Sequence, residues 1–453
     1  MTLLTEDRDA DDGAGIPFRG ESRHREPPRP AAGRWGRRGG GGAVGLVALD
    51  RARHVEVPLY SETVAFAAPG VRRLVPAGGI EELVPGTRVL QAGPYRSRLV
   101  EDEQAWLEGC APWVGRVRDD GLLRSALLDL RALSDGLPVA VAGWSPRWRY
   151  AWPRDVAFVA SALARLGRPD EAVAQLSFLA RVQRPDGWFE ARYDGWTGRA
   201  PDERMPQLDG SGWVLWAAAQ VAAHAPDRAA ALLAPLRPML VRSARRLLAS
   251  RDPGTGLPPP SSDYWELVED RLTLGTAAAV LAGLRSATDA LFHVGEMALR
   301  DRTAAAAEHL AEQVREHFGP LGYPRLLGSR VPDAAVTFLV APIGAADASL
   351  DVLQAVDRAQ TAMARPAGGL APGAGWKDDG ISWTPETALF AAAWAATGFR
   401  TKSEHLLDWL GRHRTDAGSF PEKVLHDGRP AAVAPLAWTA ALVVIARHET
   451  VST

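Results

Sequence analysis

Apolar residues recur at three- and four-residue spacing over most of the chain from about Asp119 onward, the period of amphipathic α-helices. Leu and Ala are the residues that recur at these positions. The spacing predicts twelve helices, at residues 119–134, 154–167, 169–183, 211–225, 227–250, 273–299, 302–317, 333–342, 348–363, 384–397, 400–413 and 434–448.

The links between these twelve predicted helices alternate in length. Links after even-numbered helices are only a few residues long (GRP, AP, RDR, GF), whereas links after odd-numbered helices are long, polar and aromatic. Short links make antiparallel neighbours, so the alternation predicts six helical hairpins with every long loop on one face. Six hairpins that close into a ring form a mainly α fold, the (α/α)6 toroid. We expect its long loops to surround a crater.

The first part of the chain follows other patterns. Residues 1–42 are rich in Gly, Pro, Arg and Asp, a composition that buries too little apolar surface to order itself. The following segment has short β-type runs, such as VEVPLYSETVAFA and TRVLQAG, separated by Pro-Gly and Gly-Gly turns. We therefore predict a disordered tail at 1–42, a small β-rich N-terminal region at 43–115 and an (α/α)6 catalytic domain at 116–453.

Composition narrows the possible partners of this 453-residue chain. Its formal charge is −2 and its arginines are dispersed, so no basic face is built for nucleic acid. The single cysteine, Cys110, forms no internal disulfide, and the ten histidines show no metal-ligand spacing, so no metal or cofactor is expected. The acidic N-terminus lacks a signal-peptide pattern, and no stretch approaches the roughly 20 apolar residues of a membrane span. We expect a cytoplasmic protein with no membrane partner, and the oligomeric state stays open.

Tryptophan residues gather in the long loops. Eight of the sixteen fall there, at positions 144, 148, 152, 188, 196, 265, 376 and 383. Their flat faces stack on sugar rings, while Arg154 and Asp155, at the end of the stretch GWSPRWRYAWPRDVA, offer donors and acceptors for hydroxyl groups. The distribution predicts a carbohydrate-binding face, although we expect one or two of these indoles to fill the centre of the ring instead.

Carboxylates are the best candidates for catalysis, because no GxSxG elbow, metal motif or phosphate loop is present. Glu266 follows Trp265 in SSDYWELVED, and Glu422 follows Pro421 in GSFPEKV. A carboxyl against an indole loses hydration, which favours the neutral form that a general acid needs. One neutral and one charged carboxyl are the minimum equipment for glycoside hydrolysis.

From Gly143 to Ala446 the chain resembles glycoside hydrolase family 15, the glucoamylase family with its trehalase and glucodextranase relatives. YAWPRD is similar to the family's YxWPRD segment, which implies that Tyr150, Trp152, Arg154 and Asp155 bind the nonreducing-end glucose. QLDGSG resembles the family's QxDGxG stretch and puts Asp209 near the same sugar.

The remaining matches concern the catalytic groups. YWELVED resembles the motif that carries the family's general acid, which implies this role for Glu266, with Trp265 beside it. FPEKV followed by PLAWTAA resembles the LPE and PLxWSxA pair, which implies that Glu422 is the general base and Trp438 a wall of the site. Loops three and six of a six-hairpin ring face each other, which leaves room for a water between the two carboxyls and predicts inversion of the anomeric configuration.

The resemblance implies an exo-acting α-glucoside hydrolase that releases glucose from an α-glucan or oligosaccharide. Trehalase activity on the same fold is an alternative, and so is a catalytically idle sugar-binding relative. A terpene-cyclase-like toroid is a further alternative, but DDG at 378–380 matches its acidic motif poorly. Two features depart from the family: only about sixty residues are available for its N-terminal β-sandwich, and the loop GGLAPGAGWKDDGISWTPE resembles it only loosely.

Overall fold

The computed structural model describes residues 55–117 and 121–452, and these belong to one compact unit. The predicted disordered tail at 1–42 and the first residues, 43–54, of the predicted β-rich region lie outside the described residues. The α-helices of the described part are α1 Arg96–Glu108, α2 Leu122–Ser134, α3 Pro153–Arg165, α4 Pro169–Val182, α5 Asp209–His224, α6 Ala229–Leu233, α7 Arg237–Ser250, α8 Leu274–His293, α9 Met297–Phe318, α10 Leu350–Met363, α11 Thr384–Ala396, α12 Arg400–Arg412 and α13 Ala437–Ser452.

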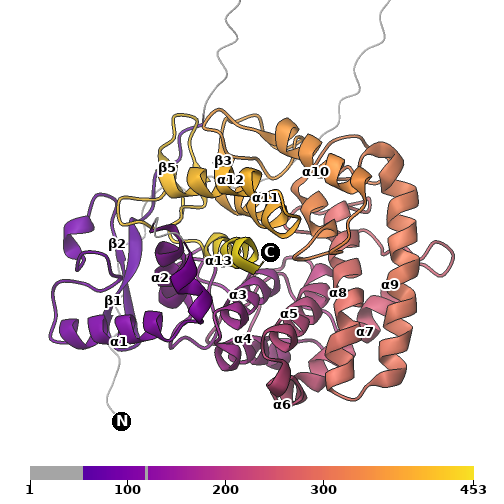
Figure 1. Ribbon diagram of the computed structural model, residues 1–453, viewed down its shortest axis with the longest axis horizontal. Coiled ribbons are helices and arrows are strands. Elements are labelled where there is room, and N and C mark those ends of the chain that lie inside the picture. The colour runs from indigo at the N-terminus through magenta and orange to yellow at the C-terminus, as the bar shows by residue number, and fades with distance from the viewer. Residues whose placement is uncertain (1–54, 118–120, 453) are drawn as a thin grey trace, which may run out of the picture. The chain divides into compact units, whose positions relative to one another are not determined.

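Six of the elements form an inner ring. The helices α3, α5 and α8, the 3-10 helix η6 (Ala334–Leu339), and the helices α11 and α13 contact one another in that order, and α13 returns to contact α3. The helices α4, α7, α9, α10, α12 and α2 pack outside them, each against its neighbour in the ring (Figure 1). The mainly α fold and the six hairpins predicted from the spacing are thus confirmed.

Small residues allow the inner helices to approach closely. The inner helix α5 contains the run WAAA and α8 contains TAAAVLAGL, both almost entirely buried. A Cβ atom on Gly212 of α5 would lie 2.2 Å from the Ala279 carbonyl oxygen of α8, and one on Gly283 would lie 2.4 Å from Gly212 Cα. Glycine is therefore required at both positions, because the two backbones meet there.

Helix ends differ from the prediction where proline or glycine intervenes. The single helix expected at 227–250 is broken into α6, a 3-10 turn and α7, because Pro235 and Pro238 lack the N–H groups that a continuous helix needs. The helix expected at 273–299 ends at His293, because Gly295 adopts a left-handed φ of 76° that terminates it. The next helix accordingly begins at Met297 and not at residue 302.

The segment expected as a helix at 333–342 forms only the 3-10 helix η6. It lies between Pro332 and Pro342, and its β-branched Val336 and Thr337 lower the preference for α-helix. It is nevertheless fully buried and takes the place of an inner helix.

The N-terminal region contains a small antiparallel hairpin of β1 (Thr63–Ala68) and β2 (Val71–Val75), which confirms the predicted β region. Its TRVLQAG run makes only isolated bridges. The helix α1 was not predicted from the sequence, because its polar face carries five charged residues and its apolar side is reduced to a few positions such as Leu99 and Trp106.

A buried network joins this region to the C-terminal part of the ring. Arg88 donates two hydrogen bonds, of 3.0 and 2.8 Å, to Asp129 of α2, which is fully buried. The same carboxylate accepts bonds from the Ser419 hydroxyl (2.7 Å) and from the Phe420 backbone N–H (3.0 Å). The segment leading to Glu422 is therefore held by residues from the beginning of the described chain.

Candidate active site

Glu266 lies in the long connection between α7 and α8 and accepts hydrogen bonds from two other loops. Its Oε1 accepts from the Trp152 indole N–H at 3.1 Å and from Gln207 Nε2 at 3.3 Å. Its Oε2 contacts the guanidinium of Arg204, while Arg154 Nη1 lies 3.9 Å from Oε1. The indole that bonds to this carboxylate is thus Trp152, whereas the neighbouring Trp265 packs elsewhere.

Glu266 has an unusual backbone conformation that its surroundings maintain. Its φ of 59° lies in the left-handed region, which is uncommon outside glycine and concentrates at functional sites. Its N–H donates to the Asp263 carbonyl at 2.8 Å, and Asp263 in turn pairs with Arg325 through two bonds of 3.0 and 3.1 Å. Arg325 is buried and its guanidinium lies 3.7 Å from the Trp265 ring centre, so it supports the whole turn.

Glu422 lies between α12 and α13, immediately before the short strand β4 (Lys423–Val424). Its backbone N–H donates to Val433 at 2.8 Å, and its carbonyl accepts from Thr384 at 3.1 Å. Strand β4 pairs on one side with β3 (Ser382–Trp383) and on the other with β5 (Pro430–Ala431). The Trp148 indole donates to Oε1 at 3.1 Å, whereas Oε2 makes no hydrogen bond and lies 3.3 Å from Lys423 Nζ.

Arg154 lies at the start of α3, with its Nη1 atom 3.9 Å from Glu266 Oε1. Pro153 occupies the first helical turn, where a missing N–H costs nothing, so Arg154 and Asp155 are presented at the helix N-terminus. The guanidinium bonds to Asp155 at 3.1 Å and its carbon lies 4.6 Å from the centre of the Trp438 ring in α13. Its Nε and Nη1 atoms are buried without hydrogen bonds.

Burial changes the acidity of the carboxyls around Arg154. Burial raises the pKa of Asp155, although the adjacent guanidinium opposes the shift. Burial also raises the pKa of Asp209 to about 7, again against the effect of Arg154. Asp209 stands in the first turn of α5 and accepts a bond from the Trp213 indole at 3.1 Å. Several acidic groups thus share one cation in a region shielded from water.

The remaining predicted sugar-binding residues, Tyr150 and Trp265, make aromatic contacts with other loop residues. Tyr150 contacts the Trp152 ring at 6.4 Å, and the guanidinium of Arg192 lies 4.5 Å from the Tyr150 ring centre. Trp265 forms an edge-to-face contact with Trp376 at 4.7 Å, and Trp376 contacts Trp383 in the same way at 5.7 Å. Loop tryptophans therefore form a connected aromatic row beside the Glu266 turn.

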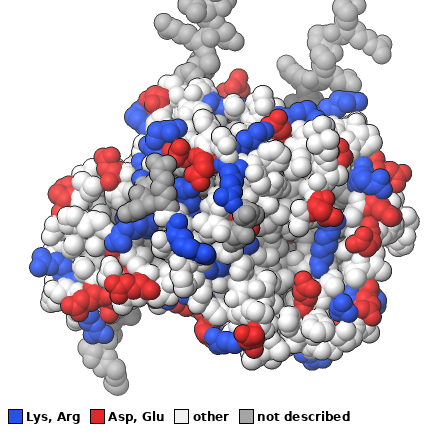
Figure 2. Space-filling model, viewed as in Figure 1, with Lys and Arg blue, Asp and Glu red and all other residues white. Residues whose placement is uncertain are grey.

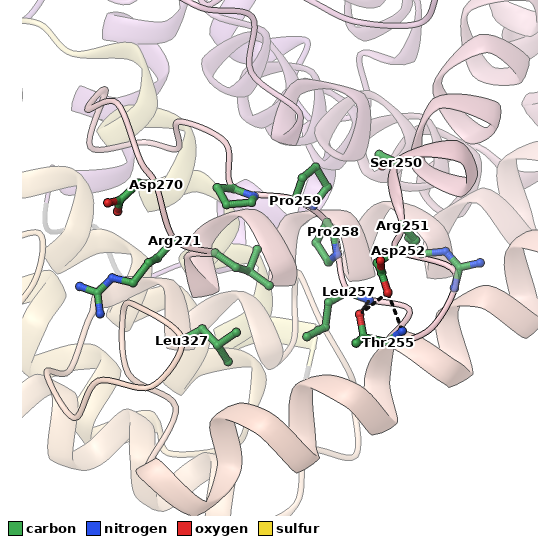
Figure 3. A pocket seen from close by; sticks show the side chains of 12 residues that line it. Ser250, Arg251, Asp252, Thr255, Leu257, Pro258, Pro259, Asp270, Arg271 and Leu327 are labelled. Atoms are coloured by element: carbon green, nitrogen blue, oxygen red, sulfur yellow. Dashed lines mark hydrogen bonds between the residues drawn. The ribbon is translucent and has the colours of Figure 1, made fainter.

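A cavity of about 600 Å³ lies outside this group of residues (Figure 3). It is lined by the beginning of the Glu266 loop, including Arg251, Asp252 and Leu257, and by Asp270 and Leu327. In Figure 3 the side chains of Arg251, Asp270 and Arg271 lie at the edge of the cavity and point away from its centre. None of the predicted catalytic residues lines the cavity.

Within residues 55–117 and 121–452, no set of three or more His, Cys, Asp or Glu side chains is arranged to hold a metal ion. No helix in this part of the chain combines the length and apolar character needed to cross a membrane.

Comparison with known proteins identifies the fold to which this arrangement belongs. The profile of the mannosylglycerate hydrolase MGH1-like glycoside hydrolase domain matches residues 148–263. A solved glycosidase in complex with glucose is 20% identical, with a TM-score of 0.62, over 73% of this chain and 96% of its own. A bacterial glucoamylase complexed with acarbose is 17% identical, with a TM-score of 0.64, over 79% of this chain and 59% of its own. The chain has the six-hairpin glycosidase fold.

Other comparisons agree with this fold without narrowing the family. Glucoamylase from Saccharomycopsis fibuligera is 14% identical, with a TM-score of 0.58, over 74% of this chain and 94% of its own. No curated protein sequence matches the chain. The matching profile is not that of glycoside hydrolase family 15, so membership of that family stays a prediction.

Several residues of this candidate site were not predicted as site residues from the sequence. Trp148 and Gln207 bond directly to the two glutamates, and both stood inside stretches already singled out. Arg204 and Arg325 lie outside the motifs quoted from the sequence, and Glu386 ends the loop GGLAPGAGWKDDGISWTPE, which resembles the family only loosely. Nothing local in the sequence marks them, because their proximity to the site depends on how the loops fold.

Proposed function

We propose that this six-hairpin glycosidase fold carries an exo-acting, inverting α-glucoside hydrolase. One observation supports it most: a single loop, residues 135–152, provides an indole N–H to each of the two glutamates, Trp152 to Glu266 and Trp148 to Glu422. The two carboxyls are thereby oriented from one side by rigid groups, as a pair that acts on one bond requires. The glucose and acarbose complexes of the structural neighbours support a glycosidic substrate.

In the proposed mechanism Glu266 donates a proton to the glycosidic oxygen. For this step its Oε2 must exchange the Arg204 guanidinium for the leaving group, while Trp152 and Gln207 keep Oε1 in place. Glu422 accepts a proton from the attacking water through Oε2, the oxygen that has no hydrogen bond. Arg154 and Asp155 hold the terminal sugar, which limits the reaction to chain ends.

The experiment incubates the pure protein with trehalose, maltose, isomaltose and maltotetraose and assays released glucose. Proton NMR of the first product from an α-linked substrate then gives the stereochemistry, and β-glucose is expected to appear before α-glucose. Glu266→Gln and Glu422→Gln should each lower kcat by about 10² to 10⁴ while substrate still binds. Turnover of trehalose alone would favour the trehalase alternative, and no turnover at all would favour an idle sugar-binding protein.

A second candidate is hydrolysis of a glycoside whose leaving group is a small acid. Two observations favour it: the matching domain profile is named for a mannosylglycerate hydrolase, and Arg204 reaches the predicted general acid from a partly exposed position. Its side chain is 41% exposed, and its other ion pair is with Asp202 at 3.3 Å. A guanidinium beside the leaving-group oxygen would bind a carboxylate on that group.

Mannosylglycerate and glucosylglycerate, added to the substrate panel, test this candidate. Arg204→Gln should raise KM for the acidic substrates much more than for maltose. Arg199→Gln, an exposed arginine of the same loop, is the matched control. Equal effects of Arg204→Gln on acidic and neutral substrates would remove the acidic leaving group from consideration.

A further inference from the structure

Several buried polar atoms near the two predicted catalytic glutamates make no hydrogen bond within the described residues. Glu386, in the first turn of α11, is only 3% exposed, and its Oε2 makes no hydrogen bond. Arg154 Nε and Nη1 and Glu422 Oε2 also make no hydrogen bond, although Nη1 lies 3.9 Å from Glu266 Oε1 and Glu422 Oε2 lies 3.3 Å from Lys423 Nζ. A buried polar group that has lost water without gaining a partner costs free energy, so a native protein rarely keeps several together. Their coincidence indicates a place for a ligand with many hydroxyl groups.

Glu386 belongs to the same site as the other two residues, because the start of α11 is bound to the Glu422 segment. The Thr384 N–H donates to the Glu422 carbonyl at 3.1 Å, and the Thr384 hydroxyl donates to the Pro421 carbonyl at 2.5 Å. The charges of Glu422 and Arg154 both act on the Glu386 carboxyl. The three side chains come from α11, from the loop before α13 and from α3. In the inner ring α13 contacts both α11 and α3, so these three segments are neighbours.

The Glu386 carboxyl holds its proton more tightly than an ordinary glutamate does. Burial raises the pKa of Glu386 to about 8, and the negative charge of Glu422 adds to the increase. At neutral pH the Glu386 side chain therefore carries a proton, and it can donate a hydrogen bond next to an acceptor carboxylate.

We propose that Glu386 is a third carboxyl of the sugar site, whose unpartnered Oε2 binds a hydroxyl of the glycosyl ring held by Arg154 and Asp155. The assignment rests on the proposed function and adds a specificity-determining residue to it. Glu386 selects the ring by the position of one hydroxyl and takes no part in proton transfer to the glycosidic oxygen or from water.

The test is a double-mutant cycle between the residue and the substrate. Wild type and Glu386→Leu are assayed with p-nitrophenyl α-glucoside and with its 2-, 3-, 4- and 6-deoxy analogues. Loss of one buried hydrogen bond should lower kcat/KM roughly 10- to 100-fold in Glu386→Leu. For one analogue, removal of the hydroxyl should cost much less in Glu386→Leu than in wild type, because the partner is already absent. Glu386→Gln keeps a donor at the same place and should restore most of the activity.

The matched control is Glu103→Gln, which changes another buried carboxyl with a raised pKa, outside the site, where it bonds to Arg88 N–H. It should leave the pattern of deoxy substrates unchanged. Additive losses for all four analogues in Glu386→Leu would overturn the assignment. If wild type hydrolyses nothing, the proposed function fails, and calorimetric titration of glucose and the four deoxyglucoses into both proteins applies the same cycle to binding.

Discussion

At the scale of single residues, the contacts around Arg154 give the most direct prediction. Asp155→Asn removes the charge that pairs with the Arg154 guanidinium at 3.1 Å, inside a site where both side chains are buried. Transition-state binding should weaken by about 1–3 kcal/mol, the cost of leaving a buried polar group poorly paired. The measurement is kcat/KM on an accepted α-glucoside.

Asp170→Asn is the control for this substitution, because it also breaks an Asp–Arg pair, with Arg228, but on the exposed surface of α4. It should change neither kcat/KM nor stability appreciably. Wild-type turnover in Asp155→Asn would remove Asp155 from the sugar site.

The raised pKa of Glu386 predicts how stability depends on pH. The group titrates near 8 in the folded protein and near its ordinary 4.5 when unfolded, so the folded state holds the proton more tightly. This contribution to stability is complete below about pH 4.5 and is lost as the pH rises toward 8. The charged and titratable groups that face Glu386 include Arg154, Glu422 and Asp333, and burial raises the pKa of Asp333 to about 6, so Asp333 titrates within the same range.

Glu386→Gln removes the titrating group, so the variant should gain stability relative to wild type as the pH increases from 4.5 to 8. Thermal melts at several pH values measure the difference in Tm between the two proteins. A constant difference over this interval would show that Glu386 ionises normally in the folded protein.

At the scale of elements, the turn that carries Glu266 depends on an arginine contributed by another loop. Arg325 pairs with Asp263 at 3.0 Å and with Glu269 at 2.6 Å, and lies over the Trp265 ring. Lysine keeps the charge but cannot form these planar paired bonds. Arg325→Lys should therefore lower kcat by displacing Glu266 and also reduce the free energy of unfolding by about 1–3 kcal/mol.

Arg330→Lys, at an exposed position of the same connection, serves as the comparison. It should match wild type in both measurements. Unchanged kcat in Arg325→Lys, with only stability reduced, would mean that the turn keeps its conformation without the arginine.

The helix α2 joins the N-terminal region to the Glu422 segment through Asp129. Asp129→Asn leaves the buried Arg88 without its counterion and weakens the bonds from Ser419 and Phe420. Breaking a buried ion pair typically costs about 3–5 kcal/mol. Urea unfolding should show this loss, whereas Asp102→Asn in the exposed Arg98 pair of α1 should show almost none.

The elements also show which parts of this fold a sequence pattern can predict. The order of the helices around the ring could be predicted from the apolar spacing and the link lengths. The spacing shows which face of each helix is buried, and a short link makes two consecutive helices antiparallel neighbours. The predicted helix limits near Pro235, Gly295 and Pro342 were wrong, because the apolar period of the sequence continues past these residues although each of them interrupts or ends a helix. The helix α1 was missed because a short, highly charged surface helix leaves little periodic signal.

For the site, the sequence motifs identified Glu266, Glu422, Arg154 and Asp155 as candidate residues, and the roles of these residues stay predictions. Their partners were harder to foresee. Trp152, and not the adjacent Trp265, bonds to Glu266, since contacts across loops are set by folding and not by sequence distance. Arg325 supports the Glu266 turn through Asp263, and Glu386 faces Glu422 and Arg154, yet the sequence around neither residue suggests these contacts.

At the scale of the whole molecule, the predicted division of the chain can be tested by truncation. The composition of residues 1–42 offers little that could join an apolar core. A protein that begins near Gly42 should retain its Tm and the proposed glycosidase activity. An insoluble product, or a Tm several degrees lower, would show that the segment contributes to the folded structure.

Electrostatics at this scale favour neutral partners. Figure 2 shows acidic and basic side chains interspersed over the visible face, without a broad region of one sign. Together with the formal net charge of −2, this mixture of signs gives the visible face little long-range attraction for polyanions.

The closure of the inner ring by α13 has a consequence for biosynthesis. As the chain leaves the ribosome, α3 emerges long before α13, yet the Ala- and Val-rich face of α13 is what covers the flank of α3. Until then a partly built arc exposes apolar flanks at both of its ends, and such species bind one another readily. Pairing segments so distant in sequence is also slow. The yield of soluble protein in a cell should therefore depend on the time between the emergence of α3 and that of α13. Translation speed and chaperone supply should matter more for this fold than for one in which neighbouring segments pair with each other.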